Sequence, residues 1–244
     1  YRLTGLERVQ PGSATSLGDV YRDVAKSLGL SRTPLYHRRE AGALSAEIAS
    51  LNPAAVVLTG EVHEETPELR YLLGAALTGA MPPHVLVNGL PEAEVRALLD
   101  VLAAAFGPVG VAPEVAPETA KLVQHLWEAM TPRADRRLRE IFAEHGPITY
   151  EEAQGGTKQA MWRAGLFASG DLTTTLRMVL VELGEPLDVP VSAPDGLAKA
   201  CEAHPAIADL VRLATRMEYA EARWQLADGA DRPAPKGWQP QPQE

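Results

Sequence analysis

The chain has 244 residues, a formal net charge of −9, 45% hydrophobic residues and only 5% aromatic residues. This length is enough for one sizeable core, which must be built mainly from Ala, Leu and Val. The acidic balance argues against binding to nucleic acid, because such proteins present a basic face to phosphates. Cys201 is the one cysteine, so no internal disulfide is possible, and a reducing, cytoplasmic setting is expected.

The N-terminal quarter predicts a helix followed by short strands. Residues 1–15 are expected to be a linker, and 16–30 carry apolar residues at helical spacing, including Leu17, Val20 and Val24. The runs 33–40, 44–51 and 53–62 have β character and are broken by Gly, Asn and Pro. We expect them to form a small, mostly antiparallel sheet within 33–62.

The chain after residue 66 predicts helices almost throughout. Thr131 with Pro132 is typical of a helix start, and Gly184 is typical of a helix end. The expected helices are 67–80, 92–106, 117–130, 133–145, 149–168, 171–183, 194–202 and 205–216, the last with a continuation toward 226. The predicted fold is α+β, predominantly helical, with one domain over 16–227.

The two ends of the chain carry separate expectations. The first residue is Tyr1 rather than Met, so we expect the chain to be part of a longer protein. The stretch 228–244 is rich in Pro and Gln and should be extended, with Trp238 as the residue that could anchor it by apolar burial. No apolar run approaches the ~18–20 residues of a membrane span, so no membrane segment is expected.

The stretch 66–84, TPELRYLLGAALTGAMPPH, is the most informative in the sequence. Thr66 is a good N-cap, Pro67 suits the first helical position, and leucines and alanines follow at helical spacing. Taken alone, this pattern predicts a core helix.

With its flanks, this stretch resembles the core of the gluzincin metallopeptidases, specifically the CAAX-prenyl endopeptidase type. In that family an apolar edge strand leads into a helix with the pattern E-L-x-x-[VIL]-L-G-H-E-L-x-H, often with a further His shortly after. Here a strand-like segment precedes the helix in the same way. The residues that match are Glu68, Leu69, Leu73, Gly74, Leu77 and His84.

The catalytic residues of that pattern are absent from this sequence. The resemblance places the two zinc-binding histidines at Ala75 and Gly79, and the general-base glutamate at Ala76. Alanine and glycine side chains offer zinc no donor atom, and nothing at 76 could deprotonate a bound water.

A second resemblance lies downstream, in KQAMWRAGLFASGDL over 158–172. The family carries its third ligand in a pattern like E-x-x-A-D-R-A-G-L-L-A, which is similar to the sequence around Arg163 and Gly165. The Asp position is Trp162, and Lys158 or Gln159 occupies the neighbourhood of the ligand Glu. Both halves of the site therefore lack their donors.

The resemblance implies a metallopeptidase-like fold with an erased metal site: no catalytic residue, no cofactor and no metal. We expect a pseudoenzyme, a non-catalytic protein-interaction or scaffold domain. One alternative is a plain structural helical domain. Another is a hydrolase with an unusual metal site built from residues such as His37, His63 and His84.

Candidate partner contacts follow from position and charge. The acidic turn 61–65, His84, Trp162 and Trp238 are chosen for their place relative to the erased site. The basic run over 133–140 is expected to meet an acidic protein surface rather than nucleic acid, given the overall charge. Its candidate contacts are Arg133, Arg136 and Arg137.

Overall fold

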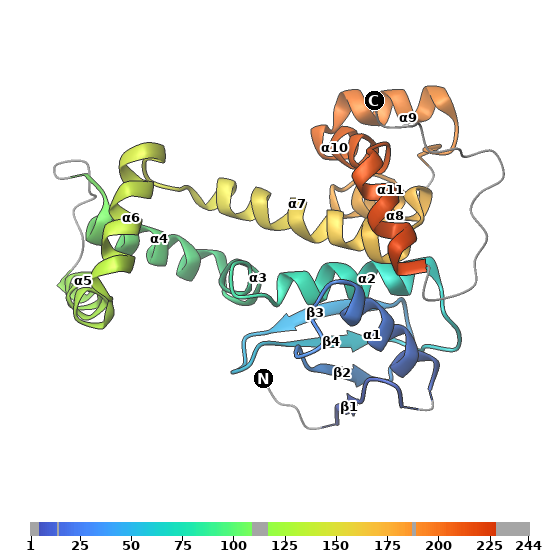
Figure 1. Ribbon diagram of the computed structural model, residues 1–244, viewed down its shortest axis with the longest axis horizontal. Coiled ribbons are helices and arrows are strands. Elements are labelled where there is room, and N and C mark those ends of the chain that lie inside the picture. The colour runs from blue at the N-terminus through green and yellow to red at the C-terminus, as the bar shows by residue number, and fades with distance from the viewer. Residues whose placement is uncertain (1–4, 14, 109–116, 187–188, 228–244) are drawn as a thin grey trace.

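The computed structural model describes residues 5–13, 15–108, 117–186 and 189–227. A small sheet lies at one side of the molecule. Two long rows of helix run side by side over the sheet and beyond it, and further helices lie at both ends of those rows (Figure 1). The predicted α+β class, dominated by helix, is confirmed.

The sheet contains β1 (Glu7–Val9), β2 (Leu35–Arg38), β3 (Ser45–Ala49) and β4 (Ala55–Thr59), in the spatial order β1-β2-β4-β3. The outer pairs are antiparallel, but β2 and β4 are parallel. The sheet is therefore mixed, and the expectation of a mostly antiparallel sheet needs correction. The reason is that β3 lies outside β4, which leaves β4 beside β2 with the same direction.

Strand β1 falls inside the segment that the sequence suggested was a linker. It pairs with β2 so that Glu7 lies opposite His37 and Val9 lies opposite Leu35. Residues directly opposite in an antiparallel pair share a face of the sheet. Glu7, Val9 and His37 therefore project from one face.

That face is covered by α1 (Ser16–Ser27) and α2 (Pro67–Gly79). The side chain of Thr15 accepts a hydrogen bond from the Gly18 amide, and that of Thr66 accepts one from the Leu69 amide, so both helices begin at a side-chain cap. The core between helices and sheet includes the buried residues Leu17, Val20, Val24, Leu35, Ile48, Val56, Leu58, Leu69, Leu73 and Leu77.

Helix α7 (Tyr150–Ser169) lies antiparallel to α2 along its length (Figure 1). Its N-terminus carries a capping box, in which Thr149 and Glu152 each accept a hydrogen bond from the backbone of the other. The expected helices at 67–80 and 149–168 agree with these bounds to within one residue.

The helices α3 (Val85–Gly89), α4 (Glu92–Phe106), α5 (Pro117–Ala129) and α6 (Pro132–His145) extend away from the sheet (Figure 1). We call α4, α5 and α6 the arm. Its helices enclose a separate core that includes Phe106, Val123 and Phe142. Of these four helices, only the short α3 has no counterpart among the expected ones.

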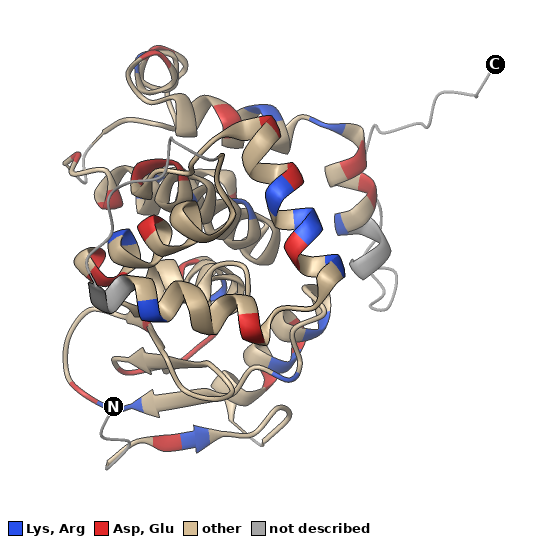
Figure 2. Cartoon of the chain, turned by 90° about the vertical axis from the view of Figure 1, so that its left-hand side faces the viewer, with Lys and Arg blue, Asp and Glu red and all other residues tan. Residues whose placement is uncertain are grey.

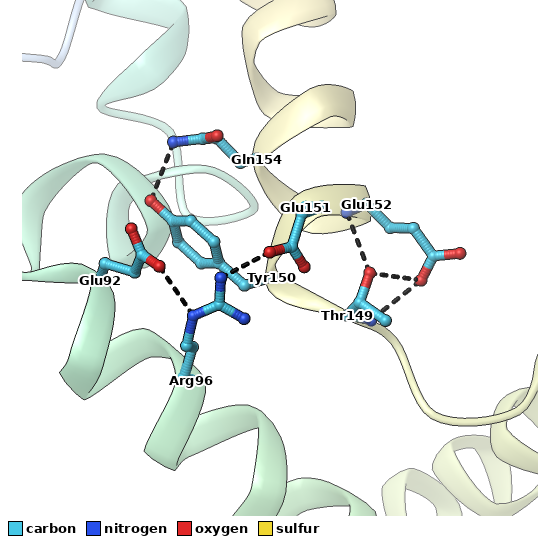
Figure 3. A network of polar contacts seen from close by, with 7 residues as sticks. All are labelled: Glu92, Arg96, Thr149, Tyr150, Glu151, Glu152 and Gln154. Atoms are coloured by element: carbon cyan, nitrogen blue, oxygen red, sulfur yellow. Dashed lines mark hydrogen bonds and ion pairs between the residues drawn. The ribbon is translucent and has the colours of Figure 1, made fainter.

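Arg96 on α4 joins the arm to α7 (Figure 3). Its guanidinium donates to Glu92 at 2.8 Å and to Glu151 at 2.5 Å, and lies 4.7 Å from the centre of the Tyr150 ring. The contact thus combines ion pairs and a cation–π interaction at an exposed position.

The last described helices are α8 (Leu172–Glu182), α9 (Pro194–Ala203), α10 (Pro205–Ala214) and α11 (Met217–Ala227). They pack against α7 around a further core that includes Leu176, Val179, Leu180, Ile207 and Leu210. The expected continuation toward 226 is instead a separate helix, α11. The tail 228–244, with Trp238, lies outside the described residues.

None of the described helices combines the length and the apolar character needed to cross a membrane.

Candidate functional site

The positions that the resemblance would assign to zinc-binding residues lie on α2, where Ala75, Ala76 and Gly79 are buried. Ala75 and Ala76 are 6% and 2% exposed. A Cβ atom at Gly79 would lie 2.5 Å from Ile48 Cδ1 of β3 and 3.0 Å from Met161 Cε of α7. With Asn88 Nδ2 also 3.0 Å away, a side chain at 79 would have to displace the ends of three neighbouring side chains.

Two further glycines bring the backbones of α2 and α7 close together. A Cβ atom at Gly74 would lie 2.5 Å from Ala168 Cβ and 2.8 Å from the carbonyl oxygen of Ala164. A Cβ atom at Gly165 would lie 2.5 Å from the Tyr71 ring. Since real Cβ atoms do not approach so closely, the helices can pack at this distance only because these residues have no side chain.

Trp162, at the position of the family's Asp, is a core residue. It is 7% exposed, and its Nε1 donates to Glu182 Oε2 at 2.7 Å. The hydroxyl of Tyr71 donates to the other oxygen of the same carboxylate at 3.1 Å. Burial, followed by the charge of Glu182, raises the pKa of Tyr71, so this hydroxyl stays protonated and remains a donor.

The burial of Trp162 changes its interpretation. A side chain enclosed by α2, α7 and α8 cannot meet a partner, so the prediction that Trp162 is a partner contact was wrong. Glu182, which anchors both aromatic donors, was missed from the sequence because its role depends on two helices distant along the chain.

His84, just before α3, contacts α7 at Thr157, the residue before Lys158. His84 Nδ1 is 3.2 Å from the Thr157 hydroxyl, and Thr157 is 4% exposed. Asn88 donates to the carbonyl oxygens of His84 and Gly79, at 3.2 and 3.4 Å. The His84 contact reaches α7 and the Asn88 bonds tie α3 to the end of α2, which gives His84 a structural role in the described fold.

The histidines of the alternative hydrolase hypothesis do not all converge. His37 on β2 and His63, just after β4, line one cavity, whereas His84 contacts α7. Over residues 5–13, 15–108, 117–186 and 189–227, no three side chains of His, Cys, Asp or Glu gather closely enough to hold a metal ion.

The basic run lies on α6, where Arg133, Arg136 and Arg137 are exposed. Arg137 is 3.3 Å from Glu140, while Arg133 and Arg136 have no ion-pair partner in the described part of the chain. Figure 2 shows Lys and Arg interspersed with Asp and Glu over the helices that face the viewer. The acidic turn 61–65 is also at the surface, with Glu61 close to His63 and Glu65 paired with Arg70.

Comparison with known proteins finds no family model, no curated protein and no solved structure that matches this chain.

Proposed function

We propose that this chain is a non-catalytic protein-interaction domain built on a metallopeptidase-like fold. The observation that carries the proposal is the closed contact between α2 and α7. At the positions that would need donor atoms, the buried residues Ala75, Ala76 and Gly79 carry none, and Trp162 is buried in the core.

The arrangement of elements supports the metallopeptidase-like part of the proposal. Strand β4 is the element before α2, Ile48 of β3 lies beside Gly79 of that helix, and α7 packs against it. The order of strand, helix and later helix is the one that the resemblance implies, but β4 is a central strand of the sheet, whereas the family's pattern has an edge strand. A plain helical stack would have no sheet beside residues 67–79, so the alternative of a purely structural helical domain is less well supported.

The arm is the part that we propose meets a partner. Leu122 and Trp127 on α5 are 41% and 51% exposed, and Ile148 after α6 is 42% exposed. Exposed aromatic and aliphatic side chains commonly anchor protein interfaces. With Arg133 and Arg136 lacking ion-pair partners among the described residues, an acidic protein surface is the partner chemistry that we infer.

An affinity-capture experiment with paired variants tests this proposal. The full chain would be compared with Arg133→Glu/Arg136→Glu and with the control Lys26→Glu/Arg32→Glu, which reverses two exposed charges outside the arm. We expect acidic proteins retained by the wild type and the control to be lost from the arm variant. Equal retention by all three proteins would contradict the role of the arm.

A further inference from the structure

Two adjacent glycines, Gly155 and Gly156, lie in the second turn of α7, the helix that follows the arm along the chain. Both are exposed, and a Cβ atom added to either would meet no heavy atom within 4 Å. Gly74 and Gly165, by contrast, permit close contacts that a Cβ atom would block. Inside a helix, each glycine is disfavoured relative to alanine by a factor of about four to five. Packing therefore does not explain the two glycines at 155 and 156.

The residues just before these glycines are fastened to the arm (Figure 3). Arg96 of α4 forms an ion pair with Glu151 and lies over the ring of Tyr150. Gln154 Nε2 donates to the Tyr150 hydroxyl at 2.8 Å. The network ends at Gln154, directly before Gly155, so the first turn of α7 belongs with the arm.

The residue just after the glycines is fastened to the rest of the chain. Thr157 is 4% exposed, and its hydroxyl is 3.2 Å from His84 Nδ1. Beyond it, α7 packs along α2 and contributes Trp162 and Leu166 to the core with α8 and α10. The two glycines thus separate a segment that is held by the arm from a segment that is held by α2.

The other connection to the arm is interrupted at the same level. Helices α3 and α4 are separated by Leu90, whose backbone is extended, and by Pro91. A proline has no backbone N–H with which to continue a preceding helix. This break lies between His84 and Arg96, the two residues whose contacts flank the glycines of α7.

The arm also has its own core. Phe106, Val123 and Phe142 are buried among α4, α5 and α6, apart from the cores of the sheet and of the last helices. A rotation at the two interruptions would leave this core intact.

We propose that the arm moves as a rigid body about a hinge formed by Gly155–Gly156 and Leu90–Pro91. A hinge needs a few residues that absorb changes in φ and ψ, and glycine accepts the widest range of both. The motion would change the direction in which Leu122, Trp127 and the basic run of α6 face, so that the arm can adjust its orientation to a partner. The inference goes beyond the proposed function, because the motion itself requires no partner.

Double electron–electron resonance on the full chain tests the proposal. One spin-label pair, Lys26→Cys on α1 with Ala143→Cys on α6, spans the hinge. The reference pair, Lys26→Cys with Arg177→Cys on α8, lies on one side of it. All three positions are exposed, and the native cysteine is removed by Cys201→Ala. We expect a broader distance distribution for the pair that spans the hinge than for the reference pair.

Alanine at both hinge glycines should restrict the motion. Because the two substitutions together favour the helix by about twentyfold, Gly155→Ala/Gly156→Ala should narrow the distribution across the hinge about twofold. The distribution of the reference pair should not change. The matched control Lys158→Ala, two residues farther along α7, exchanges two good helix formers and should leave both distributions as they are in the wild type.

Three results would overturn the inference. The first is a wild-type distribution across the hinge that is as narrow as that of the reference pair. The second is the same width in the wild type and in the double alanine variant, and the third is equal narrowing by Lys158→Ala. None of these measurements involves a partner or a metal, so failure of the hinge is distinguishable from failure of the proposed function.

Discussion

Replacement of Gly74 by alanine tests the close contact between α2 and α7 most sharply. Alanine is favoured over glycine inside a helix by about 1 kcal/mol. At this position, however, the added Cβ would lie 2.5 Å from Ala168 Cβ and 2.8 Å from the Ala164 carbonyl oxygen. Both obstacles are rigid, because one is the backbone of α7 and the other is attached directly to it, so the helices must separate.

The magnitude follows from these opposed effects. Overpacking of a well-packed core costs about 1–3 kcal/mol, and the displacement also weakens neighbouring contacts such as Tyr71 on Gly165. After the helix propensity gain of about 1 kcal/mol is subtracted, we expect Gly74→Ala to lower the free energy of unfolding by up to about 2 kcal/mol. For a chain of this size, that corresponds to a Tm lower by up to roughly 8 °C.

Gly155 supplies the matched control. It lies within α7, and an added Cβ would meet no heavy atom within 4 Å. Gly155→Ala should therefore raise the free energy of unfolding by about 0.5–1 kcal/mol. Urea unfolding followed by circular dichroism would measure both variants. If Gly74→Ala proves as stabilising as Gly155→Ala, the close approach of α2 and α7 is wrong.

Three further predictions concern other contacts. Trp162→Asp introduces the residue of the pattern that the sequence resembles but places a carboxylate in the core, so it should lower the free energy of unfolding by more than about 3 kcal/mol in urea, and no gain in zinc binding should accompany it. Arg163 donates to Asp209 at 2.7 and 2.8 Å and lowers the pKa of that carboxyl group. Because the pKa is lower in the folded than in the unfolded chain, the ion pair stabilises the fold at pH values above about 4, and this stabilisation is lost as the pH falls. Asp209→Asn should therefore lower the free energy of unfolding by about 1 kcal/mol at pH 7, a small value because solvent screens the half-exposed Arg163. The difference in stability between the variant and the wild type should shrink below about pH 4. Arg96→Ala should speed amide hydrogen exchange in α4 and leave the exchange rates in α8 unchanged. If the substitution changed the rates equally in both helices, the role of Arg96 in holding the arm would be contradicted.

The long helices could be predicted from the sequence because their signals are local. Thr66 with Pro67 and Thr131 with Pro132 begin helices where the capping rules place them. The five-residue α3 has no side-chain cap, and β1 has only three residues, so neither carries a periodic pattern that could be detected.

The order of the strands in the sheet was harder to predict from the sequence than the type of each element. The strands follow one another closely in sequence, which favoured antiparallel neighbours, yet β3 lies at the edge and β4 returns beside β2. Strand pairing order is decided by packing against α1 and α2 rather than by residue alternation. Similarly, the sequence identified Trp162 as a departure from the family pattern, but its burial and its bond to Glu182 depend on how α8 folds back and on α2, which is distant along the chain.

Metal content is the most direct test of the central proposal, that this chain is a non-catalytic domain on a metallopeptidase-like fold. The purified chain would be dialysed, with and without prior addition of zinc, and its bound metal measured by mass spectrometry. We expect far less than one zinc ion per chain in both samples, because the buried residues Ala75, Ala76 and Gly79 have no side-chain donor atoms. One zinc ion per chain that survives dialysis would contradict the account and would require a set of ligands other than the erased site.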